Sequence, residues 1–246
     1  MTERLSLRID SKIYPTVDGK RLTALAGFEL VAEPGSFTCL IGPSGCGKST
    51  ALRILMGLDR DFAGAVTLPV GRDGGSARLG VMFQEPRLLP WRTVEQNVRL
   101  ALPDRERDRD LAGLFTELGL DEMTGRFPAE LSGGLARRAV LARALAVEPE
   151  LLILDEPFVS LDAMTAARLR RLTADALDRR RATTVMVTHD IREALALADR
   201  IVVMSARPGR VVGEMAIDVA RAARDSAFIE AGLAELAGRH PEQVRG

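Results

Sequence analysis

Several residue types are scarce in this sequence, and each shortage excludes a class of protein. The 34 acidic residues equal the 34 basic ones, so the formal net charge is zero. Proteins that bind nucleic acid electrostatically need a basic excess or a basic face, so we expect no nucleic-acid partner. Two cysteines in 246 residues cannot build a disulfide framework, and nothing therefore indicates a secreted protein.

Long apolar runs are also missing. The runs at residues 151–154 and 201–204 contain four residues each, whereas a membrane-spanning helix needs about 20. Residues 1–10 carry charges and lack the apolar stretch of a signal peptide. We therefore expect a protein with no transmembrane segment or signal peptide of its own, which reaches a membrane only through a partner.

The apolar pattern predicts a fold of mixed strands and helices. At 46% hydrophobic residues the chain is too apolar to be disordered. Alternation and short apolar runs predict strands at residues 5–9, 28–32, 37–41, 151–154, 184–188 and 201–204, with short strands within 64–83. Helical spacing predicts helices at residues 49–58, 104–118, 137–147, 162–180, 191–198 and 225–238. Strands that alternate with helices indicate an α/β protein with a mainly parallel sheet and helices on both faces.

A glycine-rich loop between a predicted strand and a predicted helix has the pattern Gly-x-x-x-x-Gly-Lys-Ser. Its residues are Gly42, Pro43, Ser44, Gly45, Cys46, Gly47, Lys48, Ser49 and Thr50. Glycines let such a backbone curl around phosphate oxygens, and the following helix adds its positive N-terminal end. The motif assigns the β- and γ-phosphates to Lys48 and Mg²⁺ to the Ser49 hydroxyl. Only three of the 34 basic residues are lysine, which marks Lys48 as a place that requires a compact ammonium.

Two carboxylates follow the apolar run at 151–154. In an open α/β sheet, ligands bind outside the carboxyl edge of the strands, where Asp155 and Glu156 are expected to lie. Asp155 can hold Mg²⁺ through water, and Glu156 can accept a proton from an attacking water.

A third set of motifs resembles one family. Residues 131–134 read Leu-Ser-Gly-Gly, and Asp155-Glu156-Pro157, Ser160-Leu161-Asp162 and His189 follow in order. With Lys48 and Gln84, this series resembles the nucleotide-binding subunit of ABC transporters over about residues 3–215. The resemblance implies a P-loop NTPase fold with a RecA-like core, an N-terminal antiparallel β part and an inserted α-helical subdomain.

The resemblance also implies a role for each motif. Residues 42–50 would form the Walker A loop, and Asp155 and Glu156 would complete Walker B, with Glu156 as the general base. Gln84 would touch Mg²⁺ or the lytic water and sense a permease, and His189 would contact the γ-phosphate. Asp162 would belong to the D-loop that links two sites across a dimer. The signature loop would bind the γ-phosphate held by a second subunit, through Leu131, Ser132, Gly133, Gly134 and Leu135.

Two positions depart from the family pattern. Tyr14 resembles the aromatic residue that stacks on adenine, but the segment 14–20 lacks the usual short spacing, so a core or surface tyrosine remains an alternative. Leu135 stands where the signature usually has glutamine. The backbone N–H groups of the signature remain, so γ-phosphate binding is expected to survive, whereas leucine cannot make the side-chain hydrogen bond toward the nucleotide.

One segment resembles a particular branch of the family. Residues 84–94, which contain the single Trp91, resemble the segment after the Q-loop in ATPases of nitrate, sulfonate and taurine importers. Residues 127–130 and 207–210 fit the same branch. Residues 84–94 would line the groove for a permease, because prolines and an aromatic near solvent form a rigid apolar contact. A Trp91 that simply packs inside the protein is the alternative.

Together these observations predict one ABC ATPase domain over residues 1–246. Its core would be residues 1–86 and 148–215, its helical subdomain 87–147 and its tail 216–246. The expected function is that of an ATP- and Mg²⁺-dependent motor subunit of a bacterial importer for a small anion. Two copies would act with permease subunits at the cytoplasmic face of the inner membrane, and indirectly with a periplasmic or lipoprotein binding protein. An ABC exporter, a non-transport ABC protein and a P-loop kinase or GTPase are the alternatives.

Overall fold

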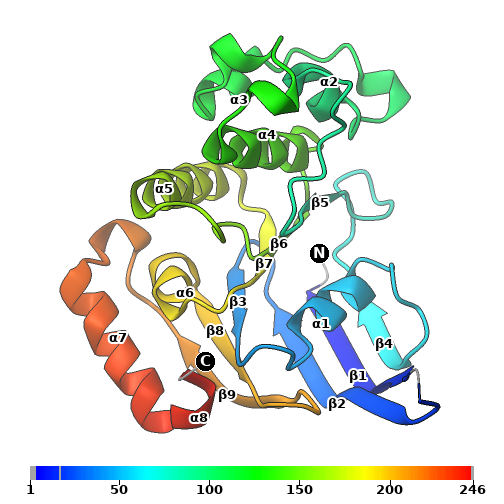
Figure 1. Ribbon diagram of the computed structural model, residues 1–246, viewed down its shortest axis with the longest axis vertical. Helices are drawn as coiled ribbons and strands as arrows, with labels where there is room; N and C mark the ends of the chain where they lie inside the picture. The colour runs from blue at the N-terminus through cyan, green and yellow to red at the C-terminus, as the bar shows by residue number, and fades with distance from the viewer. Residues whose placement is uncertain (1–3, 17, 245–246) are drawn as a thin grey trace. The chain divides into compact units, whose positions relative to one another are not determined.

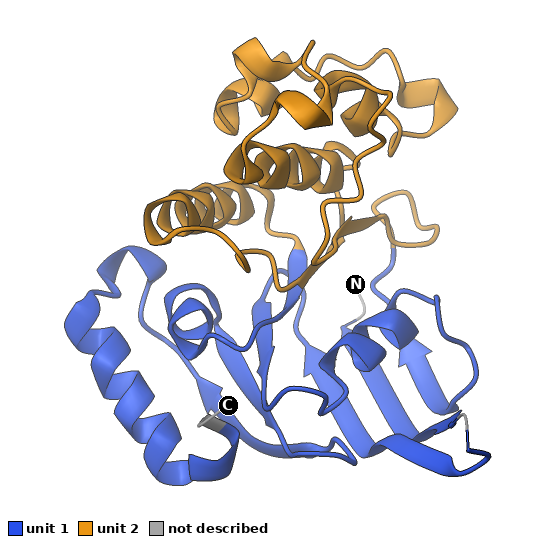
Figure 2. Ribbon diagram, viewed as in Figure 1, with its two compact units in different colours: residues 1–70, 183–246 blue, residues 71–182 orange. Residues whose placement is uncertain are grey.

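The computed structural model describes residues 4–16 and 18–244. The chain divides into two compact units, residues 1–70 with 183–246 and residues 71–182 (Figure 2). Val17, within the segment around Tyr14, and the predicted domain ends at residues 1–3 and 245–246 lie outside the described residues.

An antiparallel sheet of strands β1 (Leu5–Pro15), β2 (Arg21–Ala32) and β4 (Ala63–Thr67) forms part of the first unit, with β1 in the middle (Figure 1). The alternation predicted at 5–9 is present, because Leu5, Leu7 and Ile9 are buried. The β1 register then shifts against β4 between Ile9 and Ser11, and Lys12 after it is buried, with 2% of its surface exposed; the shift against β2 follows, between Lys12 and Ile13. An irregularity of one residue exchanges the two faces of a strand, which explains how a lysine comes to lie inside.

The first unit also holds a parallel group of strands. Strand β3 (Phe37–Ile41) is buried along its whole length, between β7 (Thr183–Val187) and β8 (Arg200–Met204), and pairs with both in parallel. Strand β9 (Val211–Ala216) joins β8 in antiparallel pairing. The helices of this unit are α1 (Lys48–Leu55), α6 (Ile191–Leu197), α7 (Ser226–Arg239) and α8 (Pro241–Val244), with a 3-10 turn at Arg221–Ala223.

The second unit combines a parallel strand pair, β5 (Leu79–Met82) and β6 (Leu151–Asp155), with helices. These are α2 (Val94–Arg99), α3 (Ala112–Glu117), α4 (Gly133–Ala146) and α5 (Ala163–Arg180), with 3-10 turns at Asp104–Glu106, Asp121–Met123 and Pro128–Glu130. Helix α4 is buried on most of its surface. It approaches β5 closely, since a Cβ on Gly80 would lie 2.3 Å from the carbonyl oxygen of Ala144.

The architecture confirms the predicted fold class: an α/β protein with a mainly parallel sheet and an N-terminal antiparallel part. One predicted element is wrong, because residues 104–118 do not form a single helix. The Arg99 guanidinium binds the carbonyl oxygens of Arg107 and Arg109, and the Asp110 side chain accepts the N–H of Ala112. Contacts of this kind compete with a continuous helix, and α3 starts only after them. Strand β9 and helix α2 are not predicted at all.

Among the helices of residues 4–16 and 18–244, none combines the length and the apolar character needed to cross a membrane.

Glu117 ties α3 to α5 through two arginines. Arg180 binds both of its carboxylate oxygens at 2.7 Å, and Arg179 adds a bond of 2.6 Å. Burial alone would raise the pKa of Glu117, but its bonds to Arg180 and Arg179 outweigh burial and lower it.

We predict that Glu117→Gln lowers the free energy of unfolding by about 1–2 kcal/mol, because it leaves two arginines without their charged partner in a partly buried position. Urea denaturation measures the change. Asp175→Asn on the same helix removes an exposed pair with Arg171 and should cost less than about 0.5 kcal/mol. Equal losses of stability in the two variants would contradict the stabilising role of the Glu117 ion pairs.

Candidate functional site

The phosphate loop connects β3 to α1 in the first unit. Gly47 caps α1 at a φ of 108°, a left-handed conformation that favours glycine. A Cβ on Gly47 would also lie 2.6 Å from the Leu25 Cδ2 atom. The backbone path therefore requires glycine at this position, and the packing beneath the loop favours it. The first turn of α1 directs its N–H groups toward the loop.

Lys48 begins α1 and is buried, with 6% of its surface exposed. Its ammonium donates hydrogen bonds to the carbonyl oxygens of Gly42 (2.6 Å) and Pro43 (3.1 Å), and lies 3.8 Å from the Cys46 sulfur. The positive charge is thus held against the loop, at the positive end of the helix. This combination attracts a multiply charged anion, as a nucleotide phosphate is.

Tyr14, the candidate for adenine stacking, lies near the end of β1. Its hydroxyl donates to Asp59 at 2.7 Å, and the Lys12 ammonium lies 4.4 Å from the centre of its ring. Burial, followed by the bond to Asp59, raises the pKa of Tyr14, whereas a hydrogen bond with the Thr50 side chain lowers it. Tyr14 is therefore adjacent to the last residue of the phosphate loop, with Lys12 on one ring face.

Lys12 and Asp59 hold this corner together. The ammonium donates to the Asp59 carboxylate at 2.8 Å and to the Asp61 carbonyl oxygen at 2.6 Å, which joins β1 to the segment after α1. Burial opposes the charge on Asp59, but hydrogen bonds from Lys12 and Tyr14 outweigh it and lower the pKa of Asp59.

His189 follows β7 in the first unit and is exposed. The residues on either side of it are well anchored. The Thr188 hydroxyl donates to the buried Glu193 carboxylate at 2.6 Å and accepts the Asp190 N–H at 3.0 Å, and Asp190 caps α6. The imidazole is thus presented from a rigid junction between a strand and a helix.

Asp155 and Glu156 lie in the second unit, where Asp155 is the last residue of β6. Glu156 has a φ of 45°, and Ser160, a few residues further on, has a φ of 63°. Left-handed backbone at residues other than glycine is strained and is found preferentially at functional sites. Arg87, Glu148 and Arg181 share this conformation, so it identifies Glu156 as part of a tight turn after β6 and is not specific to a catalytic residue.

The predicted signature loop leads into the N-terminus of α4. The Ser132 hydroxyl accepts the Leu135 N–H at 3.3 Å and caps the helix, so the Leu135 N–H is engaged within the chain. A Cβ on Gly134 would lie 2.3 Å from the Thr165 Cγ2 atom, so a larger residue there would require the Thr165 side chain to move. Asp162 caps α5 by accepting the N–H groups of Met164 and Thr165.

The segment 84–94 exposes its aromatic residue. Trp91 is 70% exposed, which excludes the alternative that it packs inside the protein. Gln84 is also exposed. Asn97, which is fully buried, binds the backbone of Leu89 and the carbonyl oxygens of Arg92 and Thr93. The tryptophan therefore projects from a loop of fixed shape.

Two arginines of α4 bind the backbone around Gln84. Arg137 donates to the Phe83 carbonyl oxygen at 3.2 Å, and Arg143 donates to those of Pro86 (3.1 Å) and Arg87 (2.8 Å). Burial lowers the pKa of both arginines. The helix that starts at Ser132 thus holds the Q-loop segment within the same unit.

The oxygen donors proposed for Mg²⁺ are a hydroxyl (Ser49), an amide (Gln84) and a carboxylate (Asp155). Hard oxygen ligands suit this ion, which completes its shell with water and substrate phosphates. Clusters of three or more His, Cys, Asp or Glu side chains able to hold a metal are absent from the described part of the chain. A hydroxyl, an amide and one carboxylate leave coordination positions for water and phosphate oxygens, so these donors fit an Mg²⁺ ion that arrives with a nucleotide.

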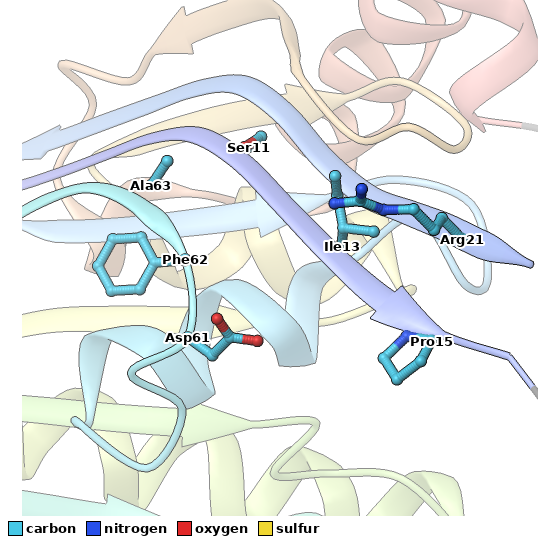
Figure 3. Close-up of a pocket in the computed structure, with 7 residues that line it drawn as sticks. All are labelled: Ser11, Ile13, Pro15, Arg21, Asp61, Phe62 and Ala63. Carbon is cyan, nitrogen blue, oxygen red and sulfur yellow. The ribbon is translucent and has the colours of Figure 1, made fainter. Parts of the chain in front are cut away.

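The predicted residues divide between the units. The phosphate loop, Tyr14 and His189 lie in the first unit, and Gln84, Asp155, Glu156, Asp162 and the signature loop lie in the second. A hollow of roughly 350 Å³ on the antiparallel sheet contains none of them (Figure 3). Its lining residues are Ser11, Ile13, Pro15, Arg21, Asp61, Phe62 and Ala63.

Sequence reasoning missed three residues that support the motifs: Lys12, Asn97 and Arg143. Lysine scarcity was the one signal that could have found Lys12, because it is one of three lysines in the chain. Asn97 and Arg143 are an asparagine and an arginine of ordinary appearance, and their roles depend on tertiary contacts.

We predict that acidification removes the contribution of Asp59 to stability. A lowered folded pKa stabilises the fold at neutral pH, and this contribution is lost as the pH falls below the ordinary value of 3.8. Asp59→Asn should therefore be less stable than the wild type at pH 7, with a smaller difference near pH 3, in urea denaturation. Asp10→Asn, which removes an exposed pair with Arg8, should change stability by less than about 0.5 kcal/mol at both pH values. A constant difference for Asp59→Asn would refute the ion-pair role.

Comparison with known proteins agrees with the motifs. The sequence pattern of the ABC transporter family matches residues 25–159. Relatives include the aliphatic sulfonates import ATP-binding proteins of Burkholderia lata (48% identical, covering 89% of this chain and 80% of the relative) and Pseudomonas aeruginosa (45% identical, covering 87% and 88%).

Solved structures agree with the sequence relatives. A dimeric bacterial ABC transporter cassette is 28% identical, with a TM-score of 0.73 over 88% of this chain and all of the cassette. A post-hydrolysis dimer of an ATP-binding cassette with ADP and Pi matches equally well. The phosphate loop between β3 and α1, Ser132 at the N-cap of α4 and the family matches lead to one conclusion: the chain belongs to the ABC transporter family, among its importer-type ATPase subunits.

Proposed function

We propose that this protein is the ATP-hydrolysing motor subunit of a bacterial importer for aliphatic sulfonates or related small anions. The observation that carries the proposal is the 45–48% identity to two sulfonate import ATP-binding proteins over 87–89% of this chain. The motifs inside the matched region have the residue types that ATP hydrolysis needs. An ABC exporter ATPase is the alternative, and the identity to import proteins argues against it.

In this proposal Lys48 and the loop N–H groups bind the β- and γ-phosphates, and Tyr14 stacks on adenine through the ring face opposite Lys12. Ser49, Gln84 and Asp155 would hold Mg²⁺, which neutralises phosphate charge when bound. Glu156 takes a proton from the attacking water, and His189 contacts the γ-phosphate. Phosphoryl transfer of this kind depends on positioning and charge neutralisation more than on covalent chemistry.

A second copy of the chain completes each site in this proposal. Ser132 and the N–H groups at the start of α4 would bind the γ-phosphate held by the partner, because a helix N-terminus favours an anion. The Leu135 side chain adds no hydrogen bond there, so the backbone and Ser132 carry the contact. Asp162 would link the two sites. The dimeric cassettes among the structural relatives support this arrangement.

The general-base role predicts a specific phenotype for Glu156→Gln. The substitution keeps the shape of the side chain and removes its basicity, so ATP binding should persist while turnover falls about 10²–10³-fold. Binding of a fluorescent ATP analogue and phosphate release measure the two properties separately. If affinity fell together with turnover, Glu156 would be a binding residue and the assignment would be wrong.

We propose that the segment 84–94 receives the permease. Trp91 is the exposed anchor, and the buried Asn97 and Arg143 hold its loop in shape. A rigid aromatic on a fixed loop loses little conformational entropy when it binds, which favours it as an interface residue. Through this contact the protein would lie at the cytoplasmic face of the inner membrane, and a separate binding protein would deliver the substrate.

Trp91→Ala should uncouple the subunit from its permease. We expect ATP hydrolysis by the isolated subunit to stay within about twofold, and permease copurification to fall at least about tenfold, as for an interface anchor. Val212→Ala, an exposed apolar residue on β9, is the matched control and should copurify normally. If Trp91→Ala copurified normally, Trp91 would not be the residue that anchors the permease.

The transport proposal itself is tested with the assembled importer in lipid vesicles. ATP hydrolysis is measured with the binding protein and, in separate arms, an alkanesulfonate, taurine or nitrate. Stimulation by sulfonates or taurine supports the proposal, and stimulation by nitrate alone would reassign the substrate. Hydrolysis that ignores every anion and the binding protein would favour the exporter alternative.

A further inference from the structure

The turn between β8 and β9 touches the phosphate loop. This turn, residues 205–210, contains the Arg-Pro-Gly-Arg sequence that was noted above only as a feature of one family branch. The Arg207 Nε and Nη2 atoms donate hydrogen bonds to the Gly45 carbonyl oxygen at 3.2 and 2.9 Å. A guanidinium therefore binds the back of the loop that is proposed to hold the nucleotide phosphates.

Gly209 fixes the base from which Arg207 reaches the loop. Its N–H donates to the Ala24 carbonyl oxygen at 2.9 Å, and its own carbonyl oxygen accepts the Ala26 N–H at 3.2 Å. A Cβ on Gly209 would lie 2.0 Å from the Cys46 carbonyl oxygen, so the two backbones are in direct contact. The turn thus braces the loop twice, through the backbone at Cys46 and through a side chain at Gly45.

The turn is also closed on itself. Ser205 exchanges backbone and side-chain hydrogen bonds with Arg210, and its hydroxyl donates toward the Pro208 carbonyl oxygen at 3.1 Å. Arg207 therefore extends from a constrained support, although the side chain itself is exposed. Two hydrogen bonds to one carbonyl oxygen, made from a constrained turn, fix the position of the Arg207 guanidinium although it is exposed.

Holding the Gly45 carbonyl has a geometric consequence. The carbonyl of Gly45 and the N–H of Cys46 belong to one trans peptide and point in opposite directions. Arg207 holds the oxygen on one side of this peptide, and on the other side the N–H of Cys46 bonds the Pro43 carbonyl oxygen at 3.3 Å. Gly45 has a φ of 74°, and glycine allows such a peptide to rotate easily. Rotation would direct a carbonyl oxygen at the bound phosphates and repel them.

We propose that Arg207 is a positioning residue for ATP binding: it locks the Gly45–Cys46 peptide with its oxygen turned away from the bound phosphates. The inference rests on the proposed ATPase function. It assigns the Arg-Pro-Gly-Arg turn a role in organising the phosphate loop, with no contact between Arg207 and the reacting atoms.

Arg207→Ala, Arg207→Gln and Arg207→Lys separate this role from a general effect of positive charge. In the full-length chain, we expect Arg207→Ala to raise the KM for ATP and the Kd of a fluorescent ATP analogue about tenfold, while kcat changes less than about threefold. Arg207→Gln keeps a donor without the charge and should recover part of the affinity. Arg207→Lys keeps the charge without the forked donor and should recover less than half of the loss.

Arg210→Ala is the matched control, because it removes an exposed arginine from the same turn. We expect it to leave KM, Kd and the melting temperature unchanged. Hydrogen–deuterium exchange of residues 42–50 without nucleotide gives a readout that is independent of activity, and it should become faster in Arg207→Ala only. If Arg207→Ala does not fold, Arg207→Gln carries the same comparison.

Three outcomes would overturn the inference: unchanged KM and Kd in a folded Arg207→Ala, full recovery of affinity by Arg207→Lys, or equal losses in Arg210→Ala. Failure of the underlying function looks different, because the wild type would then neither bind the ATP analogue nor hydrolyse ATP.

Discussion

A loop that binds phosphate through its backbone must direct N–H groups toward the anion and keep unpaired carbonyl oxygens away from it. Side chains at the turning points would block this path, which is why Gly47 stands in left-handed conformation against Leu25. The same freedom that lets glycine form the loop also lets it deform. The surrounding structure supplies the missing rigidity, through Lys48 on the inside and Arg207 and Gly209 on the outside.

Each functional loop in this protein is stabilised by polar groups that stand outside its motif. Asn97 shapes the loop that carries Trp91, and Thr188, bound to Glu193, anchors the backbone before His189. In the second unit, Arg137 and Arg143 connect the helix that follows Ser132 to the backbone beside Gln84. Buried groups with several bonds keep loops in one conformation, because breaking any bond would leave a polar atom unsatisfied. An ATPase needs this property, because each loop must present its functional residue in one conformation.

Net charge proves less informative than the placement of individual charges. The chain is neutral overall, but two of its three lysines are buried, Lys12 beneath Tyr14 and Lys48 in the phosphate loop. A compact ammonium fits both places, where several carbonyl or carboxylate oxygens converge on one point. Local placement of a few charges thus provides the anion attraction that a global positive field would otherwise have to supply.

The sequence by itself determined the fold class, the phosphate loop and the order of the motifs, because these depend on local patterns such as the apolar run at 151–154 and the glycine spacing of residues 42–47. Tertiary structure alone decided that residues 104–118 break into separate turns, that a strand forms at Val211–Ala216, and that Lys12 turns inward. It also decided that Arg207 supports Gly45 from 162 positions away along the chain. The physical reason is that such contacts join segments remote in sequence, and no spacing of neighbouring residues encodes which distant carbonyl a side chain will meet.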